Sequence, residues 1–272
     1  MATFRAMTST ADLAVIGGSG FYSFVPGTEI EVQTPYGVPS DPIVVGEVSG
    51  RRVAFLARHG RDHRFPPHRI PYRANLWALR SLGVREVFAP CAVGSLRPEV
   101  GPGSLVVPDQ MVDRTAGRVQ TYYDAGAVHV PFADPYCPRG RATVVSEAAR
   151  SGWPATDGGT MVVIEGPRFS TRAESQSYAA AGWSLVNMTG HPEAVLAREL
   201  ALCYTAVALA TDFDAGVEGG TVVTQDEVFR VFATNTGRLR DLLARVLGAL
   251  PERTGCPCPQ ALDGIETRLA LP

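Results

Sequence analysis

Two aspartates that stand two residues apart are the strongest candidates for acid chemistry in this chain. Asp212 and Asp214 follow residues 204–210, an apolar stretch typical of a buried strand. Alternate positions of an extended chain point to the same side, so the two carboxyl groups can face one site. Mutual repulsion and partial burial would raise the pKa of one of them and give an acid that donates a proton near neutral pH. The alternative interpretation is an Asp-rich turn.

Three further segments carry groups that could bind an anion. Residues 17–20, Gly-Gly-Ser-Gly, follow an apolar stretch, and glycines let backbone N–H groups converge on a phosphate. Residues 58–64 place arginines and histidines directly after another apolar stretch, and both side chains offer donors. Residues 187–193 join a strand end to a helix start, so amides near Thr189 would point out of a helix N-terminus. Each segment alone also fits a turn or charged loop without a ligand.

The basic residues of this chain are all arginines: the 25 residues counted as Lys+Arg include no lysine. Chemistry that needs a lysine amine is therefore excluded, including P-loop nucleotide hydrolysis, Schiff-base and pyridoxal-phosphate reactions and Ser-Lys hydrolysis. The glycines at 17–20 also lack the third glycine of a dinucleotide-binding fingerprint. An anion bound by this chain must meet arginine, histidine, hydroxyl or backbone N–H groups.

The length and composition indicate one large domain. The chain has 272 residues, of which 45% are hydrophobic and 19% charged, and its formal net charge is -2. That length can bury a sizeable core, and the near-neutral balance gives no support for nucleic-acid binding. We find no signal peptide and no apolar stretch of about 20 residues, so we expect a cytoplasmic protein without a membrane partner. We divide the chain into an N-terminal extension (1–11), one domain (12–250) and a C-terminal tail (251–272).

The five cysteines are too few and too dispersed for a disulfide scaffold. Two of them form Cys256-Pro257-Cys258 in the tail, but a metal site would need two more ligands, and no second Cys/His pair has zinc-finger spacing. The histidines of residues 59–68 stand among arginines that would repel a cation. We therefore expect no metal site and interpret Cys256 and Cys258 as surface thiols, with a disulfide as the alternative.

The elements that must position these residues alternate between strands and helices, which predicts an α/β domain with a largely buried sheet. A capping box at Thr171 and Glu174 marks one helix start, and Pro192 suits the first position of another. Strands are expected at 13–16, 43–48, 52–57, 86–93, 104–107, 160–164, 185–188 and 204–210, and helices at 72–82, 143–150, 171–181, 192–200 and 226–250.

In this order, the motifs resemble the trimeric purine nucleoside phosphorylase family, most closely its 5′-methylthioadenosine branch. The resemblance covers about residues 13–247 and also includes residues 56–60, 72–75, 94–97, 108–110 and 165–174. It implies a central twisted mixed β-sheet flanked by helices and a homotrimer with sites at subunit interfaces. It also implies reversible, metal-free phosphorolysis of a purine nucleoside, without a cofactor and with inorganic phosphate as co-substrate.

The resemblance assigns each candidate residue a role. Arg58 would supply the main fixed charge for phosphate, and Cys91 stands where the branch often has threonine. Asp212 and Asp214 would face the purine ring, and His129 would come from an adjacent subunit. The phosphate site it implies consists of Ser19, Arg58, His59, Cys91, Ala92 and Thr189. The nucleoside site consists of Phe169, Ser170, Met188, Asp212, Asp214, His129, Val223, Val228 and Phe229.

Asp212 also predicts the base. A carboxylate accepts a hydrogen bond from a 6-amino group, whereas related proteins for 6-oxopurines resemble this chain but carry asparagine there. We therefore expect an adenine-type substrate; the resemblance implies that it is 5′-methylthioadenosine, converted to adenine and 5-methylthioribose 1-phosphate. The alternatives are a purine nucleoside or 5′-methylthioinosine phosphorylase, a phosphorylase for another 5′-deoxyadenosine analogue, or a nucleoside-binding module that lost catalysis. A zinc deaminase would require the histidines to bind metal.

Overall fold

Four parallel strands form the middle of the protein. The computed structural model describes residues 10–126, 128–217, 223–265 and 270–272. Neighbouring strands are hydrogen-bonded in the order β4, β1, β5, β11, and most of their residues are buried. Burial on both faces explains why these strands read as continuous apolar runs. Their bounds are β4 (Arg51–Ala57), β1 (Leu13–Gly17), β5 (Glu86–Ser95) and β11 (Cys203–Phe213).

The remaining strands complete a sheet that has eleven strands among the described residues and is mixed, because β10 pairs with β5 in the antiparallel direction. Ser49 and Gly50, with φ of 51° and 74°, make the tight turn between the antiparallel strands β3 and β4, which lie close to the predicted strands 43–48 and 52–57. The other bounds are β2 (Gly27–Ile30), β3 (Ile43–Val48), β6 (Leu105–Val107), β7 (Gln110–Arg114), β8 (Thr156–Asp157), β9 (Thr160–Ile164) and β10 (Leu185–Asn187).

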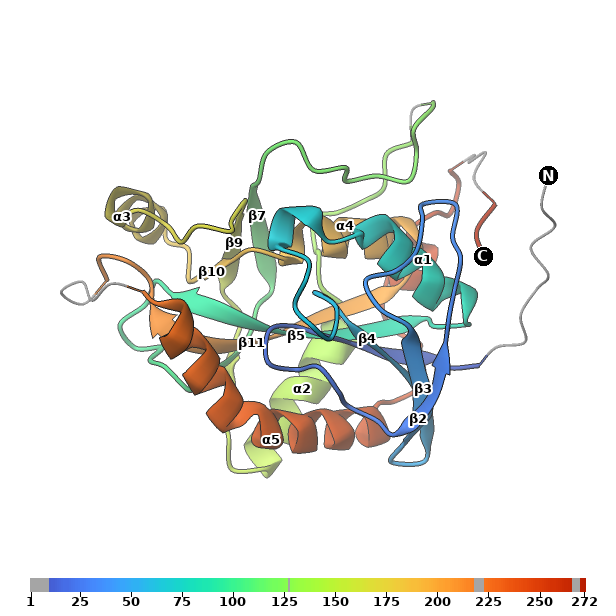
Figure 1. The fold of residues 1–272 in the computed structure, drawn as a ribbon, viewed down its shortest axis with the longest axis horizontal. Coiled ribbons are helices and arrows are strands. Elements are labelled where there is room, and N and C mark those ends of the chain that lie inside the picture. Colours follow the sequence, from blue (N-terminus) through green and yellow to red (C-terminus); the bar gives the residue numbers. More distant parts are fainter. Residues whose placement is uncertain (1–9, 127, 218–222, 266–269) are drawn as a thin grey trace.

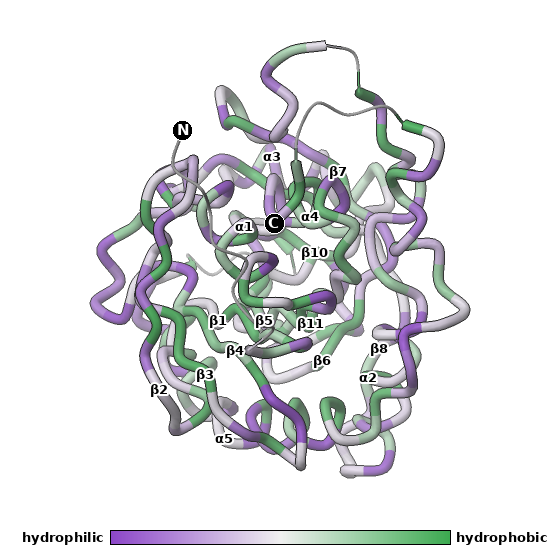
Figure 2. Tube along the Cα trace, turned by 90° about the vertical axis from the view of Figure 1, so that its right-hand side faces the viewer, coloured by the Kyte–Doolittle hydropathy of each residue, from purple (hydrophilic) through white to green (hydrophobic). Residues whose placement is uncertain are grey.

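Helices cover both faces of the sheet, as predicted (Figure 1). One buried cluster joins α1 and α4 to the side of β1 that carries Ala14 and Ile16, and another joins α2 and α5 to the side that carries Leu13 and Val15. Figure 2 shows the apolar residues concentrated along these central strands. The bounds are α1 (Tyr72–Ser81), α2 (Pro138–Arg150), α3 (Arg172–Ala180), α4 (Gly190–Glu199) and α5 (Gln225–Ala249).

Local signals located most of these elements, and the differences have physical reasons. The capping box at α3 forms as predicted, with the Glu174 backbone N–H donating to Thr171 Oγ1 at 3.2 Å. Helix α2 begins five residues before its predicted start, because its first turn, Pro-Arg-Gly-Arg-Ala, has no apolar periodicity. Strand β11 continues three residues beyond its predicted end through a bulge between Ala210 and Asp212. Strands β2, β7 and β8 were not predicted, since their side chains are largely exposed.

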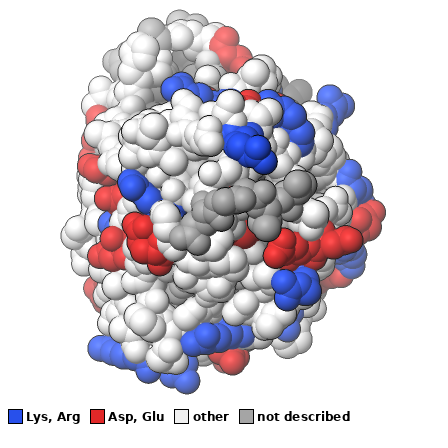
Figure 3. Space-filling model, turned by 90° about the vertical axis from the view of Figure 1, so that its left-hand side faces the viewer, with Lys and Arg blue, Asp and Glu red and all other residues white. Residues whose placement is uncertain are grey.

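The surface carries both signs of charge. On the face shown in Figure 3, acidic and basic side chains are interspersed. Within the described part of the chain, no helix is both long enough and apolar enough to cross a membrane.

Candidate active site

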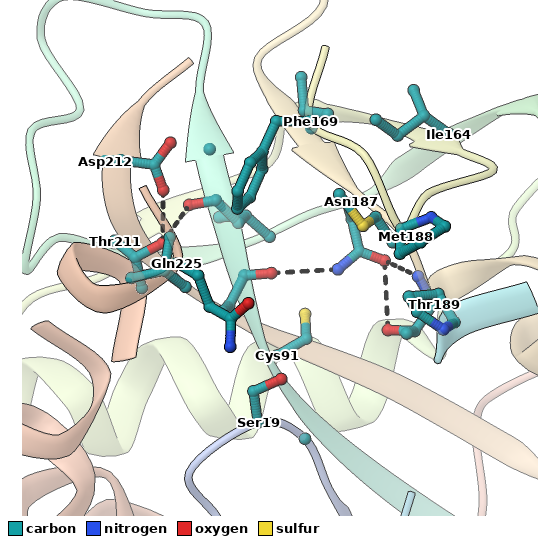
Figure 4. A pocket seen from close by; sticks show the side chains of 18 of the residues that line it. Ser19, Cys91, Ile164, Phe169, Asn187, Met188, Thr189, Thr211, Asp212 and Gln225 are labelled. Carbon is teal, nitrogen blue, oxygen red and sulfur yellow. Dashed lines mark hydrogen bonds between the residues drawn. The ribbon is translucent and has the colours of Figure 1, made fainter. Parts of the chain in front are cut away.

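A cavity of about 320 Å³ opens where the central parallel strands end, and it is large enough for a small molecule (Figure 4). Its walls come from segments far apart in the sequence, including the loop after β1, the end of β4 and the last residues of β11. The predicted residues that line it are Ser19, Arg58, His59, Cys91, Ala92, Phe169, Ser170, Met188, Thr189, Asp212, Asp214, Val228 and Phe229.

Two predicted residues are not among the described residues that line the cavity. His129 is exposed in the long loop between β7 and α2, and Val223 is half-buried just before α5. The sequence-based prediction had placed His129 in the site of an adjacent subunit, so its position in a single chain does not test that role.

At one end of the cavity, two carboxyl groups lie above a glycine of β5. A Cβ atom placed on Gly94 would stand 3.2 Å from Asp212 Oδ2 and 3.2 Å from Asp214 Oδ1. Gly94 pairs with Asp212 in the β5–β11 ladder, so the bulge before Asp212 sets both aspartates over the same spot. Glycine at this position keeps space open beside the two acids. We call this part of the cavity, made by Gly94, Asp212 and Asp214, the carboxyl end.

The two acids differ in their surroundings. Burial raises the pKa of Asp212 to about 6, although the Thr211 hydroxyl donates to its Oδ1 at 2.6 Å and opposes the shift; the charge of Asp214 raises it further. Burial also raises the pKa of Asp214, against a hydrogen bond donated by the Ser175 hydroxyl. Desolvation therefore exceeds mutual repulsion as the cause. Asp212 is a proton donor matched to slightly acid or neutral pH.

At the other end, Arg58 is only 1% exposed and is held by a carboxylate. Its Nε and Nη2 donate to Glu193 at 2.6 and 2.8 Å, while Nη1 and Nη2 donate to the Pro90 and Ile16 carbonyls at 3.2 and 3.1 Å. Glu193 also accepts from the Tyr204 hydroxyl at 2.7 Å. Four of the five guanidinium N–H groups thus have partners among the described residues.

By the sequence analysis, Arg58 is the main fixed charge for phosphate, and the structure shows that Glu193 already pairs with that charge. Burial lowers the pKa of Arg58 but the adjacent Glu193 carboxylate raises it by more, so the pair is charged and close to neutral overall. One Nη1 N–H is left for a ligand. We call Arg58, Glu193 and the residues around them that line the cavity, including Ser19, His59 and Cys91, the arginine end.

The glycine turn passes directly over this guanidinium. A Cβ atom on Gly18 would lie 2.9 Å from Arg58 Nη1 and 3.1 Å from the Pro90 carbonyl oxygen. Gly20 has a φ of 77°, which only glycine adopts at little cost. The turn therefore serves close packing on Arg58 and presents Ser19 to the cavity, next to Cys91 in Figure 4. Burial raises the pKa of the Cys91 thiol to about 12, so this side chain is neutral.

His59 is fixed in one tautomer. Its Nδ1 lies 2.8 Å from the Phe65 carbonyl oxygen, and since that oxygen can only accept, Nδ1 carries the proton. Burial lowers the pKa of His59 to about 3, which leaves the ring neutral and Nε2 without a proton. The sequence had indicated a donor to an anion. The structure makes Nε2 an acceptor.

A side-chain cap uses the amides that were expected to face an anion. The Thr189 and Gly190 backbone N–H groups donate to Asn187 Oδ1 at 2.7 and 2.6 Å, and Asn187 Nδ2 donates to the Ala92 carbonyl at 3.1 Å (Figure 4). Two of the amides that the sequence indicated as donors to an anion are therefore paired within the chain, and Thr189 itself lines the cavity. Asn187 and Glu193 lie in the motif at 187–193, but neither of them has a role assigned from the sequence. For Asn187, a signal was available, because it is a polar residue at the end of an apolar strand.

Arg118 is a further residue that the sequence did not indicate. Its side chain is 4% exposed, and its Nη1 donates to the Met188 and His191 carbonyls at 3.0 and 2.6 Å, while Nε donates to Glu165 at 3.1 Å. It therefore joins the segment before Pro167 to the segment that carries Met188, and so positions one wall of the cavity. Nothing in the local pattern around Arg118 distinguished it from other loop arginines.

Comparisons with known proteins identify the family of this chain. The sequence model of the phosphorylase superfamily matches residues 12–248. The chain is 59% identical to a protein of Streptomyces coelicolor named purine nucleoside phosphorylase, over 96% of this chain and 98% of that one. It is 58% identical to the S-methyl-5′-thioadenosine phosphorylase of Mycolicibacterium smegmatis, over 96% and 99% of the two chains.

Solved structures share the fold. A methylthioadenosine phosphorylase from an antarctic soil metagenomic library has a TM-score of 0.88 and 39% identity, covering 94% of this chain and 92% of its own. A methylthioadenosine phosphorylase from Schistosoma mansoni, in complex with adenine, has a TM-score of 0.84 and 36% identity, covering 87% and 91%. These comparisons confirm the resemblance seen in the sequence. This chain belongs to the phosphorylase superfamily.

Proposed function

We propose that this chain catalyses the reversible phosphorolysis of 5′-methylthioadenosine, giving adenine and 5-methylthioribose 1-phosphate. The observation that carries the proposal is the carboxyl end, where Asp212 combines burial, a pKa of about 6 and a position beside Asp214 above Gly94. The names of the Mycolicibacterium and Schistosoma relatives, and the adenine bound to the latter, support the same substrate.

The chemistry follows from the leaving group. A purine anion departs slowly from the sugar unless a ring nitrogen is protonated, and Asp212 as a carboxylic acid supplies that proton. Asp214 accepts a hydrogen bond from Ser175 and keeps its orientation, so the pair can bind a nitrogen-bearing ring edge. A carboxylate accepts a hydrogen bond from a 6-amino group, which favours adenine over a 6-oxopurine.

Phosphate is the proposed nucleophile, and the arginine end sets the form in which it binds. Because Glu193 already neutralises Arg58, the donors for phosphate are one Arg58 N–H, the Ser19 and Thr189 hydroxyls and the Ala92 amide. The neutral His59 can accept a hydrogen bond at Nε2 from a P–OH group. This supports binding of hydrogen phosphate with its proton toward His59. Holding phosphate opposite the departing base stabilises the cationic sugar in the transition state.

The 5′ group would lie against an apolar wall. Val228 and Phe229 line the cavity from the start of α5, and the His63 ring meets Phe229 edge-on with centroids 5.7 Å apart. Apolar contacts favour a methylthio group over a hydroxyl. We propose that the protein is a homotrimer in which His129 of an adjacent subunit and Val223 complete this region. Size-exclusion chromatography with light scattering would give the number of subunits.

A second candidate is supported by one observation, the name of the Streptomyces relative, which indicates a purine nucleoside phosphorylase. One experiment separates the two functions. The protein is incubated with 5′-methylthioadenosine, adenosine and 5′-methylthioinosine, each with and without phosphate, and the released base is measured. We expect phosphate-dependent release of adenine, fastest from 5′-methylthioadenosine. Faster release of hypoxanthine, or release that does not need phosphate, would overturn the proposal.

A further inference from the structure

Four cysteines from three parts of the chain meet in the interior. Cys137 stands directly before α2, Cys203 is the first residue of β11, and Cys256 and Cys258 lie in the C-terminal tail. Their four Sγ atoms all lie within 4.8 Å of one another, and all four residues are buried. The interpretation of Cys256 and Cys258 as surface thiols is therefore wrong: the tail folds back, and Cys258 is only 1% exposed. The second pair of ligands consists of Cys137 and Cys203, which stand 119 and 53 positions before Cys256. No local motif reveals so wide a spacing.

The separation of the sulfur atoms fits a metal ion better than a bond between them. A tetrahedral zinc–thiolate centre with Zn–S of about 2.3 Å has sulfur atoms about 3.8 Å apart. Cys203 Sγ and Cys256 Sγ are 3.6 Å apart, whereas a disulfide bond is about 2.05 Å long. A single ion at the centre of the cluster can therefore reach all four sulfurs after small side-chain adjustments.

The groups around the cluster stabilise thiolates. Arg253 Nε donates to Cys203 Sγ at 3.3 Å, and the Arg139 side chain also interacts with Cys203. Glu86, which also faces Cys203, is paired with Arg139. Cys137 occupies the N-cap position of α2, where the helix dipole favours a negative sulfur. In metal sites, hydrogen bonds from neighbouring groups orient the ligands.

We propose that Cys137, Cys203, Cys256 and Cys258 together bind one zinc ion that fastens the C-terminal tail to the domain. Four protein thiolates leave no coordination position open, which is typical of a structural rather than a catalytic site. The cluster is also remote from the active site, because Cys203 and Asp212 stand at opposite ends of β11, about 30 Å apart at the usual rise per residue.

Hydrogen bonds near the cluster already hold the C-terminal tail against α2 and against the segment that precedes β11. Arg139 Nη1 donates to the Pro251 carbonyl at 2.7 Å, and the Arg253 guanidinium donates to the Ala201 carbonyl. The zinc ion would add covalent ligation to this docking and so stabilise the folded state. The fifth cysteine, Cys91, lies in the active-site cavity and takes no part.

The test uses the full chain, purified without an affinity tag and without added reductant. Metal is measured by mass spectrometry of the elements, and thiols are titrated in denaturant before and after addition of a chelator. We expect about one zinc ion per chain, with four additional thiols titrating only after chelation. Replacement of zinc by Co²⁺ should give the visible absorption of a tetrahedral cobalt thiolate. Cys258→Ser should lower the zinc content at least tenfold, whereas Cys91→Ser, the matched control, should retain it.

Two results would overturn the proposal. One is a chain with little zinc and five freely titrating thiols. The other is a metal-free chain whose mass is lower by two hydrogen atoms for each disulfide formed within the cluster. If Cys258→Ser fails to fold, the zinc content, thiol titration and mass of the unaltered chain still decide between these outcomes. None of these measurements depends on the phosphorylase activity.

Discussion

The two ends of the active-site cavity differ in how their polar groups are satisfied. At the arginine end, Arg58 and Glu193 form a buried pair whose other hydrogen bonds go to Tyr204 and to backbone carbonyls. At the carboxyl end, Asp212 and Asp214 are buried. The basic residues among the described residues that line the cavity lie at its other end, so neither aspartate has a basic partner there. The charges at the arginine end are thus paired before a ligand binds. At the carboxyl end, burial of the two aspartates lowers the stability of the free protein, and a bound purine base would offset this destabilisation.

The largest effect is expected on catalysis at the carboxyl end. Asp212→Ala removes the proton donor and should lower kcat/KM for 5′-methylthioadenosine by roughly 10²–10⁴-fold, the usual contribution of general acid catalysis. Adenine release by the purified variant measures this. Among the described residues, Asp212 accepts one side-chain hydrogen bond, from the Thr211 hydroxyl, so the variant should still fold, which its thermal transition would check. A loss of less than tenfold would show that Asp212 is not the acid.

The next effect is on stability at the arginine end. Glu193→Ala leaves the Arg58 charge buried without a partner and should lower the free energy of unfolding by about 3–5 kcal/mol. Urea denaturation measures the change. The double variant Glu193→Ala with Arg58→Met should recover a large part of the loss, because no unpaired charge is left. A single variant as stable as the unaltered protein would contradict the idea of a pre-formed ion pair.

At the carboxyl end, removal of a negative charge should raise the free energy of unfolding, whereas at the arginine end it should lower it. The pKa of Asp212 is raised to about 6, so the folded state binds a proton more tightly than the unfolded state, and stability falls as the pH rises from about 4 to about 6. Above that range, Asp212→Asn should increase the free energy of unfolding by up to about 3 kcal/mol, from 1.36 kcal/mol for each pKa unit. Urea midpoints at pH 5 and pH 8 check this. Asp263→Asn, at an exposed position, serves as the control and should change neither midpoint. Equal urea midpoints for Asp212→Asn and the unaltered protein at pH 8 would show that burial of the Asp212 carboxylate does not destabilise the folded state.

The smallest effect concerns Cys91 at the arginine end. Its neutral thiol is a weak donor, and Cys91→Thr would place a hydroxyl of similar size at the cavity wall. One added hydrogen bond of about 0.5–1.5 kcal/mol should lower the KM for phosphate by roughly 2–10-fold and leave the KM for the nucleoside unchanged. Initial rates at saturating nucleoside measure it. An unchanged KM for phosphate would mean that Cys91 does not border the phosphate.

The sequence predicted the fold class and most of the candidate residues that line the cavity, because both depend on patterns that are local or recur at strand ends. Asp212 and Asp214, for example, were found from their spacing after an apolar strand. What it missed depends on long-range partners. Nothing near Arg58 indicates that Glu193, 135 positions away, takes up its charge. Likewise, the backbone conformation around Asn187 decides that its side chain caps Thr189 and Gly190. The four-cysteine cluster has the same origin, since its members meet only in the folded chain.

The central claim is that Asp212 both protonates the leaving base and selects a 6-aminopurine. The most direct test compares kcat/KM for 5′-methylthioadenosine and 5′-methylthioinosine in the unaltered protein and in Asp212→Asn. We predict that the unaltered protein prefers the 6-amino substrate and that the substitution lowers this preference on the order of 100-fold, since an asparagine amide can donate to a 6-oxo group. An unchanged ratio of the two kcat/KM values would contradict the account.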